Sequence, residues 1–396
     1  MSEEVGVVDI FYHEDTKELV LVEKLPDSYT VLTKRVNEVP SNVSIVSKSK
    51  VSSHLFEGRL VILDSTTSGT GRKDKTDVYK SIILPIFKEI LELKYDYIAT
   101  ENLNSIEQFA KSLKDSNEDV TVIFISGDTS ISEFINALPS IEGGLKLIVF
   151  PIPAGTGNSL ALSLNISDPL EAVKKIISQD AIDPLNLYEV AFPNGSYHLS
   201  KNEKVGLIQD PLKFLVVLSW GFHASLVADS DTPEMRKHGI ERFKLAAYSN
   251  LSQAQNYEGQ YFINDQVFDG PFAYLVFTSA KKFEPTFEIL PKGDILDDSL
   301  YSVSFKYEDE PDGKYILDIM GEVYDKGRHV EDKRVNYEKI TVGDKITLKT
   351  KNTISPRKRR FCLDGSIILL PEASEQELSI KPTGNQHRGW LIYLLH

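Results

Sequence analysis

A single acidic residue, Asp128, lies at the corner of the segment IFISGDTSISEF, which covers residues 123–134. The segment begins with a buried-strand pattern and ends with a helical one, so we expect Asp128 to sit exposed where a strand leads into a helix. A carboxylate in that place suits a reaction in which an alcohol is aligned and gives up its proton. Because Ser130 and Glu133 have the spacing of a capping box, a purely structural interpretation of this stretch is also open.

Three loops in this part of the chain combine small residues with predicted helix starts. They are DSTTSGTGRK (64–73), SGDTS (126–130) and PIPAGTGNS (151–159). Backbone N–H groups at a helix N-terminus carry partial positive charge and have no partner within the helix, so each loop can receive an anion. Each loop alone is also ordinary turn punctuation, and none is a Walker loop. Together they predict a site for a polyphosphate.

The elements that position these loops alternate between strand and helix from about residue 59 to 178. Near-continuous apolar strands such as TVIFI and LKLIVFPI predict a parallel sheet covered on both faces. Beyond about residue 185 the pattern has period two, with one helical stretch near 233–253, which predicts an antiparallel sandwich or barrel. The predicted organisation is a strand-rich N-terminal extension at 1–56, an α/β nucleotide-binding domain at 57–185 and a β-rich domain at 186–396.

The composition is typical of a soluble globular protein, with 41% hydrophobic and 26% charged residues. A net charge of −14 argues against nucleic acid as a partner, because such binding depends on Lys and Arg neutralising phosphates. The acidic N-terminus, the lack of a long apolar stretch and the single Cys362 predict a protein on the cytosolic side without disulfides. The basic run Arg357 to Arg360 is interpreted as a solvated loop or, alternatively, as a site for an anionic ligand or lipid headgroups.

These residues resemble the diacylglycerol kinase catalytic family, and within it the sphingosine (sphingoid long-chain base) kinases. SGDTSISEFINAL (126–138) is similar to the family's central turn, and IPAGTGNSLALSL (152–164) is similar to its next block. DPLNL (183–187) is similar to the family's crossing between domains. LSWGFHASLVADSDTPEMRKHGIERF (218–243) and FCLDGS (361–366) are similar to later segments. The resemblance implies an NAD kinase/diacylglycerol kinase-like α/β domain followed by a β-rich lipid-binding domain.

The resemblance further implies an ATP-dependent lipid kinase, with Mg²⁺, that phosphorylates the primary hydroxyl of a sphingoid long-chain base. Asp128 would be catalytic, orienting the lipid hydroxyl and accepting its proton. Asp229 would pair with the substrate amine if a two-residue insertion follows Phe222, and Val227 is the competing match. Asp364 would lie near both the nucleotide and the metal. The expected ATP-binding residues are Ser65, Ser68, Gly69, Gly71, Ser126, Gly127, Thr129, Gly155, Thr156, Gly157, Arg236, Arg242 and Asp364.

Three positions depart from the family pattern. Thr129 stands in place of a glycine, Ser366 in place of a glutamate, and Asp64-Ser65 in place of Asn-Pro. A β-branched residue tolerates positive φ poorly, so a catalytically impaired relative that binds lipid or nucleotide is one alternative. A kinase for diacylglycerol or ceramide and a soluble kinase of the NAD kinase fold are the others. We expect a cytoplasmic protein that makes reversible, peripheral contact with intracellular membranes.

Overall fold

The computed structural model describes residues 6–26, 28–47, 50–66, 77–239, 241–310, 313–351 and 354–396. The chain forms two compact units, one of residues 1–184 with 386–396 and the other of residues 185–385. Each unit is described by itself.

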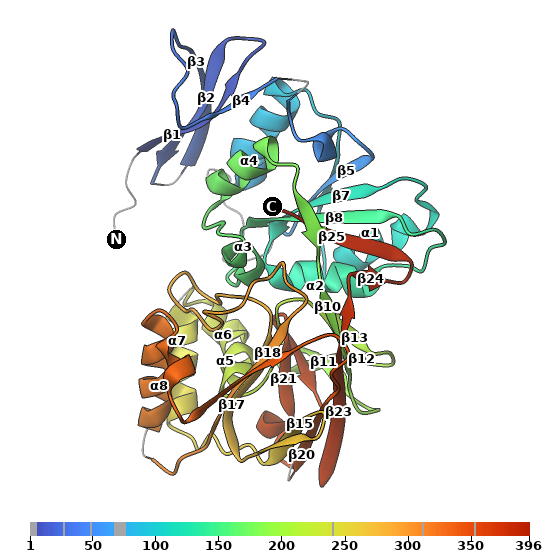
Figure 1. The fold of residues 1–396 in the computed structure, drawn as a ribbon, viewed down its shortest axis with the longest axis vertical. Coiled ribbons are helices and arrows are strands. Elements are labelled where there is room, and N and C mark those ends of the chain that lie inside the picture. The colour runs from blue at the N-terminus through green and yellow to red at the C-terminus, as the bar shows by residue number, and fades with distance from the viewer. Residues whose placement is uncertain are drawn as a thin grey trace. The chain divides into compact units, whose positions relative to one another are not determined.

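The first unit is built on a mostly parallel sheet (Figure 1). Strands β5, β6, β7, β8 and β25 pair in parallel with their neighbours. Every residue of β7 is buried, as expected for a strand covered on both faces. In sheet order the strands are β24 (Gln386–His387), β25 (Trp390–Leu395), β8 (Lys146–Pro153), β7 (Val120–Ser126), β5 (Arg59–Asp64) and β6 (Asp96–Ala99), and β9 (Ile182–Pro184) pairs with β25.

Helices follow these strands in the alternating order that the sequence predicts. They are η2 (Tyr79–Ile90), α1 (Ser105–Ser112), η3 (Leu113–Asp115), α2 (Asp128–Ala137), α3 (Ser159–Ser163) and α4 (Pro169–Ser178), and the short η1 (Ser53–Leu55) precedes β5. The helix η2 has π-type hydrogen bonding and contains Pro85. The predicted parallel α/β domain is therefore confirmed.

The last strand of the chain belongs to the first unit. Leu391 to Leu394 of β25 pair in parallel with Lys146 to Val149 of β8. We had assigned the whole segment 186–396 to the β-rich domain, and the structure differs for residues 386–396. A run such as WLIYLL is equally apolar in a parallel sheet and in a sandwich, so its sequence pattern does not distinguish the two.

The N-terminal extension is a four-stranded sheet, as predicted, in the order β3-β2-β1-β4. Its strands are β1 (Gly6–His13), β2 (Glu18–Leu25), β3 (Ser28–Arg35) and β4 (Ser44–Val46). The chain that follows is tied to α4 and the turn after it, since Ser52 N donates to Ile177 O at 3.1 Å and Ser53 N donates to Asp180 Oδ1 at 2.7 Å.

The second unit is an antiparallel sandwich, which confirms the predicted fold class. The six-stranded sheet runs β13 (Leu212–Phe214), β10 (Leu187–Ala191), β23 (Glu375–Gly384), β20 (Ile346–Lys351), β15 (Gly259–Ile263) and β16 (Gln266–Asp269). The eight-stranded sheet runs β12 (Glu203–Leu207), β11 (Tyr197–Ser200), β22 (Ser366–Leu369), β21 (Arg360–Leu363), β14 (Val217–Gly221), β17 (Phe272–Thr278), β18 (Leu300–Lys306) and β19 (Val335–Ile340). Buried side chains from both sheets, among them Trp220, Tyr261 and Leu348, form one core.

Helices of the second unit are α5 (Phe222–Ser230), α6 (Pro233–Arg236), α7 (Glu241–Leu251) and α8 (Lys314–Tyr324), with the short η5 (Arg328–Glu331) and η6 (Pro356–Arg359). The expected helical stretch near 233–253 corresponds to α6 and α7, whereas α5 and α8 were not predicted. Helix α5 follows β14 without a loop because Gly221, with φ +86°, makes the turn. Among the described residues, no helix is both long and apolar enough to cross a membrane.

Candidate active site

Asp128 is held at the junction between β7 and α2. The strand ends at Ser126, Gly127 is extended at φ −104° and ψ 177°, and Asp128 is the first residue of α2. Its carboxylate accepts hydrogen bonds from Ser159 N at 2.7 Å and from Leu160 N at 3.0 Å. These are backbone donors at the start of α3, so a carboxylate on one loop caps the helix that follows the next loop.

The two loops that meet at Asp128 are also joined by their backbones. Ala154 N and Gly155 N donate to Ser126 O at 3.0 and 3.2 Å, and Asp128 N donates to Gly157 O at 3.3 Å. The side chain of Asn158 closes its own loop, accepting from Gly155 N at 3.0 Å and donating to Gly155 O at 2.8 Å. The loops therefore form one rigid unit around the acid.

Contact between these loops is so close that only glycine fits at two positions. An ideal Cβ at Gly155 would lie 2.5 Å from Gly127 Cα, and one at Gly127 would lie 2.7 Å from Gly157 O. At Gly157 the nearest atom to such a Cβ is Asp128 Oδ2, at 3.9 Å. Gly157 is itself exposed and Thr156 is half-buried, so there is open space on the Gly157 side of the acid.

Two expectations for this junction are corrected. Asp128 is 8% exposed rather than exposed, because the loop around Gly157 and the start of α3 cover it. The capping box is wrong, since α2 begins at Asp128 and Ser130 is already its third residue. Thr129, the second residue of α2, has a helical backbone, so the strain that a positive φ would have imposed on it does not arise.

Burial raises the pKa of the Asp128 carboxyl, and the amide hydrogen bonds from Leu160 and Ser159 oppose that shift. A base must be ionised, so a raised pKa moves the acidic limb of its pH profile upward. We expect kcat/KM to fall, on acidification, at a pH above the roughly 3.9 of an ordinary aspartate. The measurement is kcat/KM against pH, beside circular dichroism at each pH. A limb at or below that value would contradict the assignment of Asp128 as the base.

The first loop lies only partly within the described residues. Ser65 is buried and its N–H donates to Ile125 O at 3.1 Å, which places it beside the end of β7. Ser68, Gly69 and Gly71 lie outside the described residues. Asp64, the departure from the family pattern, is fully buried and accepts a hydrogen bond from Tyr97 OH at 3.1 Å.

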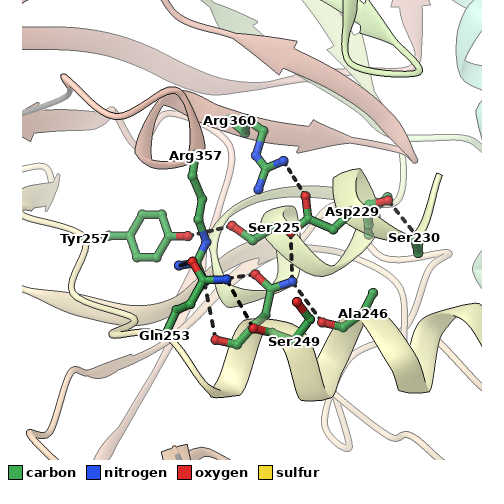
Figure 2. Close-up of polar contacts among 11 residues, drawn as sticks. Ser225, Asp229, Ser230, Ala246, Ser249, Gln253, Tyr257, Arg357 and Arg360 are labelled. Atoms are coloured by element: carbon green, nitrogen blue, oxygen red, sulfur yellow. Dashed lines mark hydrogen bonds and ion pairs between the residues drawn. The ribbon is translucent and has the colours of Figure 1, made fainter. Parts of the chain in front are cut away.

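The remaining predicted site residues belong to the second unit. Asp229 on α5 accepts from Arg360 Nη1 at 2.6 Å and from Asn250 Nδ2 at 2.9 Å, so both of its oxygens have partners (Figure 2). Arg236 pairs with Asp231 at 2.7 Å and is half exposed. Arg242 is buried on α7, with its guanidinium 4.9 Å from the ring centre of Phe243. Burial and the nearby Arg236 lower the pKa of Arg242.

Asp364 sits in the tight hairpin turn between β21 and β22. Asp364 and Gly365 have φ values of +47° and +91°, which is the pattern of a type I′ turn. The carboxylate accepts from Leu215 N at 2.9 Å, Val216 N at 2.9 Å and Val217 N at 2.8 Å. It therefore fixes the segment that enters β14, the strand that leads into α5.

This geometry does not fit the metal-ligand role expected for Asp364. Its side chain is 2% exposed, and three backbone amides already occupy both oxygens. Across the part of the chain that the structure describes, no group of three His, Cys, Asp or Glu residues is arranged to hold a metal. Any Mg²⁺ in the reaction would therefore arrive with the nucleotide phosphates, which are its usual oxygen ligands.

We expect Asp364→Asn to destabilise the second unit by about 2–4 kcal/mol, because buried amides at Leu215 to Val217 lose an ionised acceptor. Urea unfolding followed by intrinsic fluorescence measures this. The matched control is Asp294→Asn, an exposed aspartate that accepts from a single amide, Leu296 N at 3.0 Å. A loss for Asp364→Asn no larger than for the control would show that the three bonds do not support the turn.

The comparisons with known proteins agree with this arrangement of strands and loops. Residues 59–190 match the family model of the diacylglycerol kinase catalytic domain. The chain carries a diacylglycerol kinase catalytic domain. The segment 59–190 includes Asp128 and the glycine loops described above.

Two curated relatives of the catalytic domain are kinases named for a lipid. Sphingosine kinase 1 of Homo sapiens is 25% identical over 214 residues, which cover 51% of this chain and 50% of that protein. Sphingosine kinase 2 of Homo sapiens is 27% identical over 193 residues, which cover 46% of this chain and 27% of that protein. The matched part thus spans half or less of the length of these relatives.

A solved structure with the same fold is that of a diacylglycerol kinase from Bacillus anthracis. It covers 86% of this chain and 97% of its own, with a TM-score of 0.52 and 12% identity. At that identity the likeness concerns the fold alone.

Several residues of the catalytic domain and of the second unit matter in ways that the sequence reasoning missed. Asn158 closes the glycine loop, and its place in the motif GTGN was the signal that could have identified it. The partners of Asp128, Ser159 and Leu160, lie 31 and 32 residues away from it in the chain. The pairing of Arg360 with Asp229 had no signal in the sequence, because 131 residues separate the two.

Proposed function

We propose that the protein is a lipid kinase that transfers the γ-phosphate of ATP to the primary hydroxyl of a sphingoid long-chain base. The observation that carries this proposal is Asp128, an acid fixed by two backbone amides between paired glycine loops of a diacylglycerol kinase catalytic domain. Relatives named sphingosine kinase support the class of lipid.

Asp128 has the properties of a positioning base in this reaction. The amides of Ser159 and Leu160 fix the orientation of the carboxylate and leave lone pairs for the lipid hydroxyl. The lipid oxygen forms a bond to the γ-phosphorus, the bond from that phosphorus to the bridging oxygen breaks, and ADP leaves. The hydroxyl proton passes to a carboxylate oxygen of Asp128. Phosphoryl transfer depends mainly on such positioning and on charge neutralisation.

The ATP phosphates lie, in this proposal, against the open side of the glycine loops. The space beside Gly157 admits a ligand next to Asp128, and the N-terminus of α2 directs partial positive charge toward it. Thr129, as the second residue of α2, belongs to that N-terminus. Arg236 and Arg242 of the second unit are the proposed guanidinium partners of the nucleotide, since a planar fork suits phosphate oxygens.

The proposed substrate is held in a bilayer, so the protein works in reversible contact with a membrane surface. The β-rich second unit is the proposed place for the lipid chain. The cytoplasm, with peripheral contact to intracellular membranes, is the proposed location.

A second candidate is a kinase for diacylglycerol or ceramide. The observation that favours it is the pairing of Asp229, whose two oxygens already hold Arg360 and Asn250. A carboxylate that has an internal cation needs no amine from the substrate. A catalytically impaired relative is the remaining alternative, and Thr129 now argues for it less because its backbone is helical.

The test is a reaction of the purified chain with Mg-ATP and, separately, sphingosine, ceramide and diacylglycerol in mixed micelles, with each phosphorylated lipid quantified by mass spectrometry. The proposal expects sphingosine to be phosphorylated with the highest kcat/KM. A preference for a lipid without an amine would select the second candidate. No lipid product above that of an Asp128→Asn control would leave only the impaired relative.

A further inference from the structure

The basic run at Arg357 to Arg360 is not the solvated loop that we expected. Arg359 and Arg360 are each 8% exposed, and Arg357 is half-buried. The run forms η6 and the start of β21, and the side chains of Arg357 and Arg360 both reach the place where α5 and α7 pack together (Figure 2).

Only one of these arginines has an acidic partner. Arg360 donates to Asp229 at 2.6 Å. Arg357 donates to Gln253 Oε1 at 2.9 Å and to Asn250 Oδ1 at 2.9 Å, and Arg359 donates to Leu370 O at 3.0 Å, so the partners of these two are neutral. In the described part of the chain, the buried Nε atoms of all three have no hydrogen-bond partner.

The charge around this cluster is therefore out of balance. The charged groups that act on the nearby Tyr257 hydroxyl are Arg357, Arg360 and Asp229, two cations against one anion. A buried or half-buried guanidinium without a counter-ion is costly, and its free N–H donors add the cost of unmade hydrogen bonds. An anion that binds here would remove both costs.

We propose that Arg357 and Arg360 bind the phosphate monoester of a lipid headgroup, with Asp229 beside them accepting the amine of the same headgroup. This deepens the proposed function, on which it rests, because phosphorylation of an amino alcohol yields a headgroup that carries both charges. The protein would thus hold its own product. Guanidinium groups suit a phosphate because their N–H donors form two parallel bonds to its oxygens.

Counting ion pairs explains why the phosphorylated form is favoured. An amine alone would have to compete with Arg360 for Asp229, and a displaced Arg360, whose side chain is only 10% exposed, would remain buried without a partner. A headgroup with both charges exchanges one internal pair for two new ones. Asp229 is 32% exposed at its side chain, so an amine can reach it from solvent.

The test uses O-phosphoethanolamine, a soluble molecule with one amine and one phosphate monoester, titrated into the full-length chain and followed by calorimetry at fixed low salt. Inorganic phosphate and ethanolamine are the comparison probes. We expect O-phosphoethanolamine to bind on the order of tenfold more tightly than either, because each probe makes only part of the contacts. Binding is measured without ATP and repeated in an Asp128→Asn variant, so that it is separate from turnover.

Arg360→Gln and Arg357→Gln are each expected to weaken O-phosphoethanolamine binding on the order of tenfold, and Arg360→Lys by less. The matched control is Arg328→Gln, an exposed arginine of the same unit that pairs with Asp325. Thermal unfolding of each variant checks its fold, and Arg357→Gln keeps the test valid if Arg360→Gln does not fold, since Arg357 has no acidic partner to leave behind.

Three results would overturn the proposal: no binding, equal binding of inorganic phosphate, or equal losses in Arg328→Gln. Failure of the kinase assay together with intact O-phosphoethanolamine binding would instead remove the proposed function and leave the headgroup site. An active kinase without this binding would remove only the headgroup site.

Discussion

Replacing Asp128 by Asn is expected to lower lipid phosphorylation by about 10²- to 10⁴-fold, the usual contribution of a positioned base. The amide has the size of the carboxylate but cannot accept the hydroxyl proton. It also cannot accept from both Ser159 N and Leu160 N, because one of its two polar atoms is itself a donor. The measurement is kcat/KM for the lipid, with thermal unfolding recorded for the same preparation.

Asp168→Asn is the matched control for this substitution. Asp168 also accepts from two backbone amides, Leu170 N at 2.8 Å and Glu171 N at 3.0 Å, at the start of α4 in the same unit. Its replacement is expected to cost about 0.5–2 kcal/mol of stability and to leave kcat/KM unchanged. If Asp128→Asn lowered activity no more than Asp168→Asn does, the effect would be one of capping and Asp128 would not be the base.

Substituting Gly155 by Ala is expected to separate the two loops that hold Asp128. The new methyl group would lie 2.5 Å from Gly127 Cα, and backbone atoms on both sides cannot yield as a flexible side chain would. We expect a loss of about 1–3 kcal/mol in the free energy of unfolding. We expect a fall of about 10² in kcat/KM, because a displacement near 1 Å at the reacting groups has an effect of that size.

Gly157→Ala is the control within the same loop, since its methyl group would meet only Asp128 Oδ2 at 3.9 Å. We expect its unfolding free energy to stay within about 0.5 kcal/mol of the parent, as for a substitution that meets no close contact. Urea unfolding and kcat/KM are compared for both variants. Similar stability for Gly155→Ala and Gly157→Ala would show that the loops are not packed as closely as the distances indicate.

The alternation of strands and helices in the first unit could be predicted from residue order, because it depends on local periodicity. Strand β7 is apolar throughout and is followed at once by helical spacing, so both its burial and its end at Ser126 are visible in the letters. Period-two segments after residue 185 predicted the sandwich in the same way. Helix α5 was missed because it begins directly after a strand, at a glycine whose positive φ has no signature in the pattern.

The sequence by itself determined that glycine loops follow parallel strands and that an acid stands at one of them. Only the tertiary structure decided which donors and charges each acid meets: Asp128 caps α3, Asp364 holds the entry to β14, and Asp229 pairs with Arg360. The physical reason is range. Periodicity records neighbours within a few residues, whereas these carboxylates bond to groups 31, 149 and 131 residues away, which meet only when the sheets assemble.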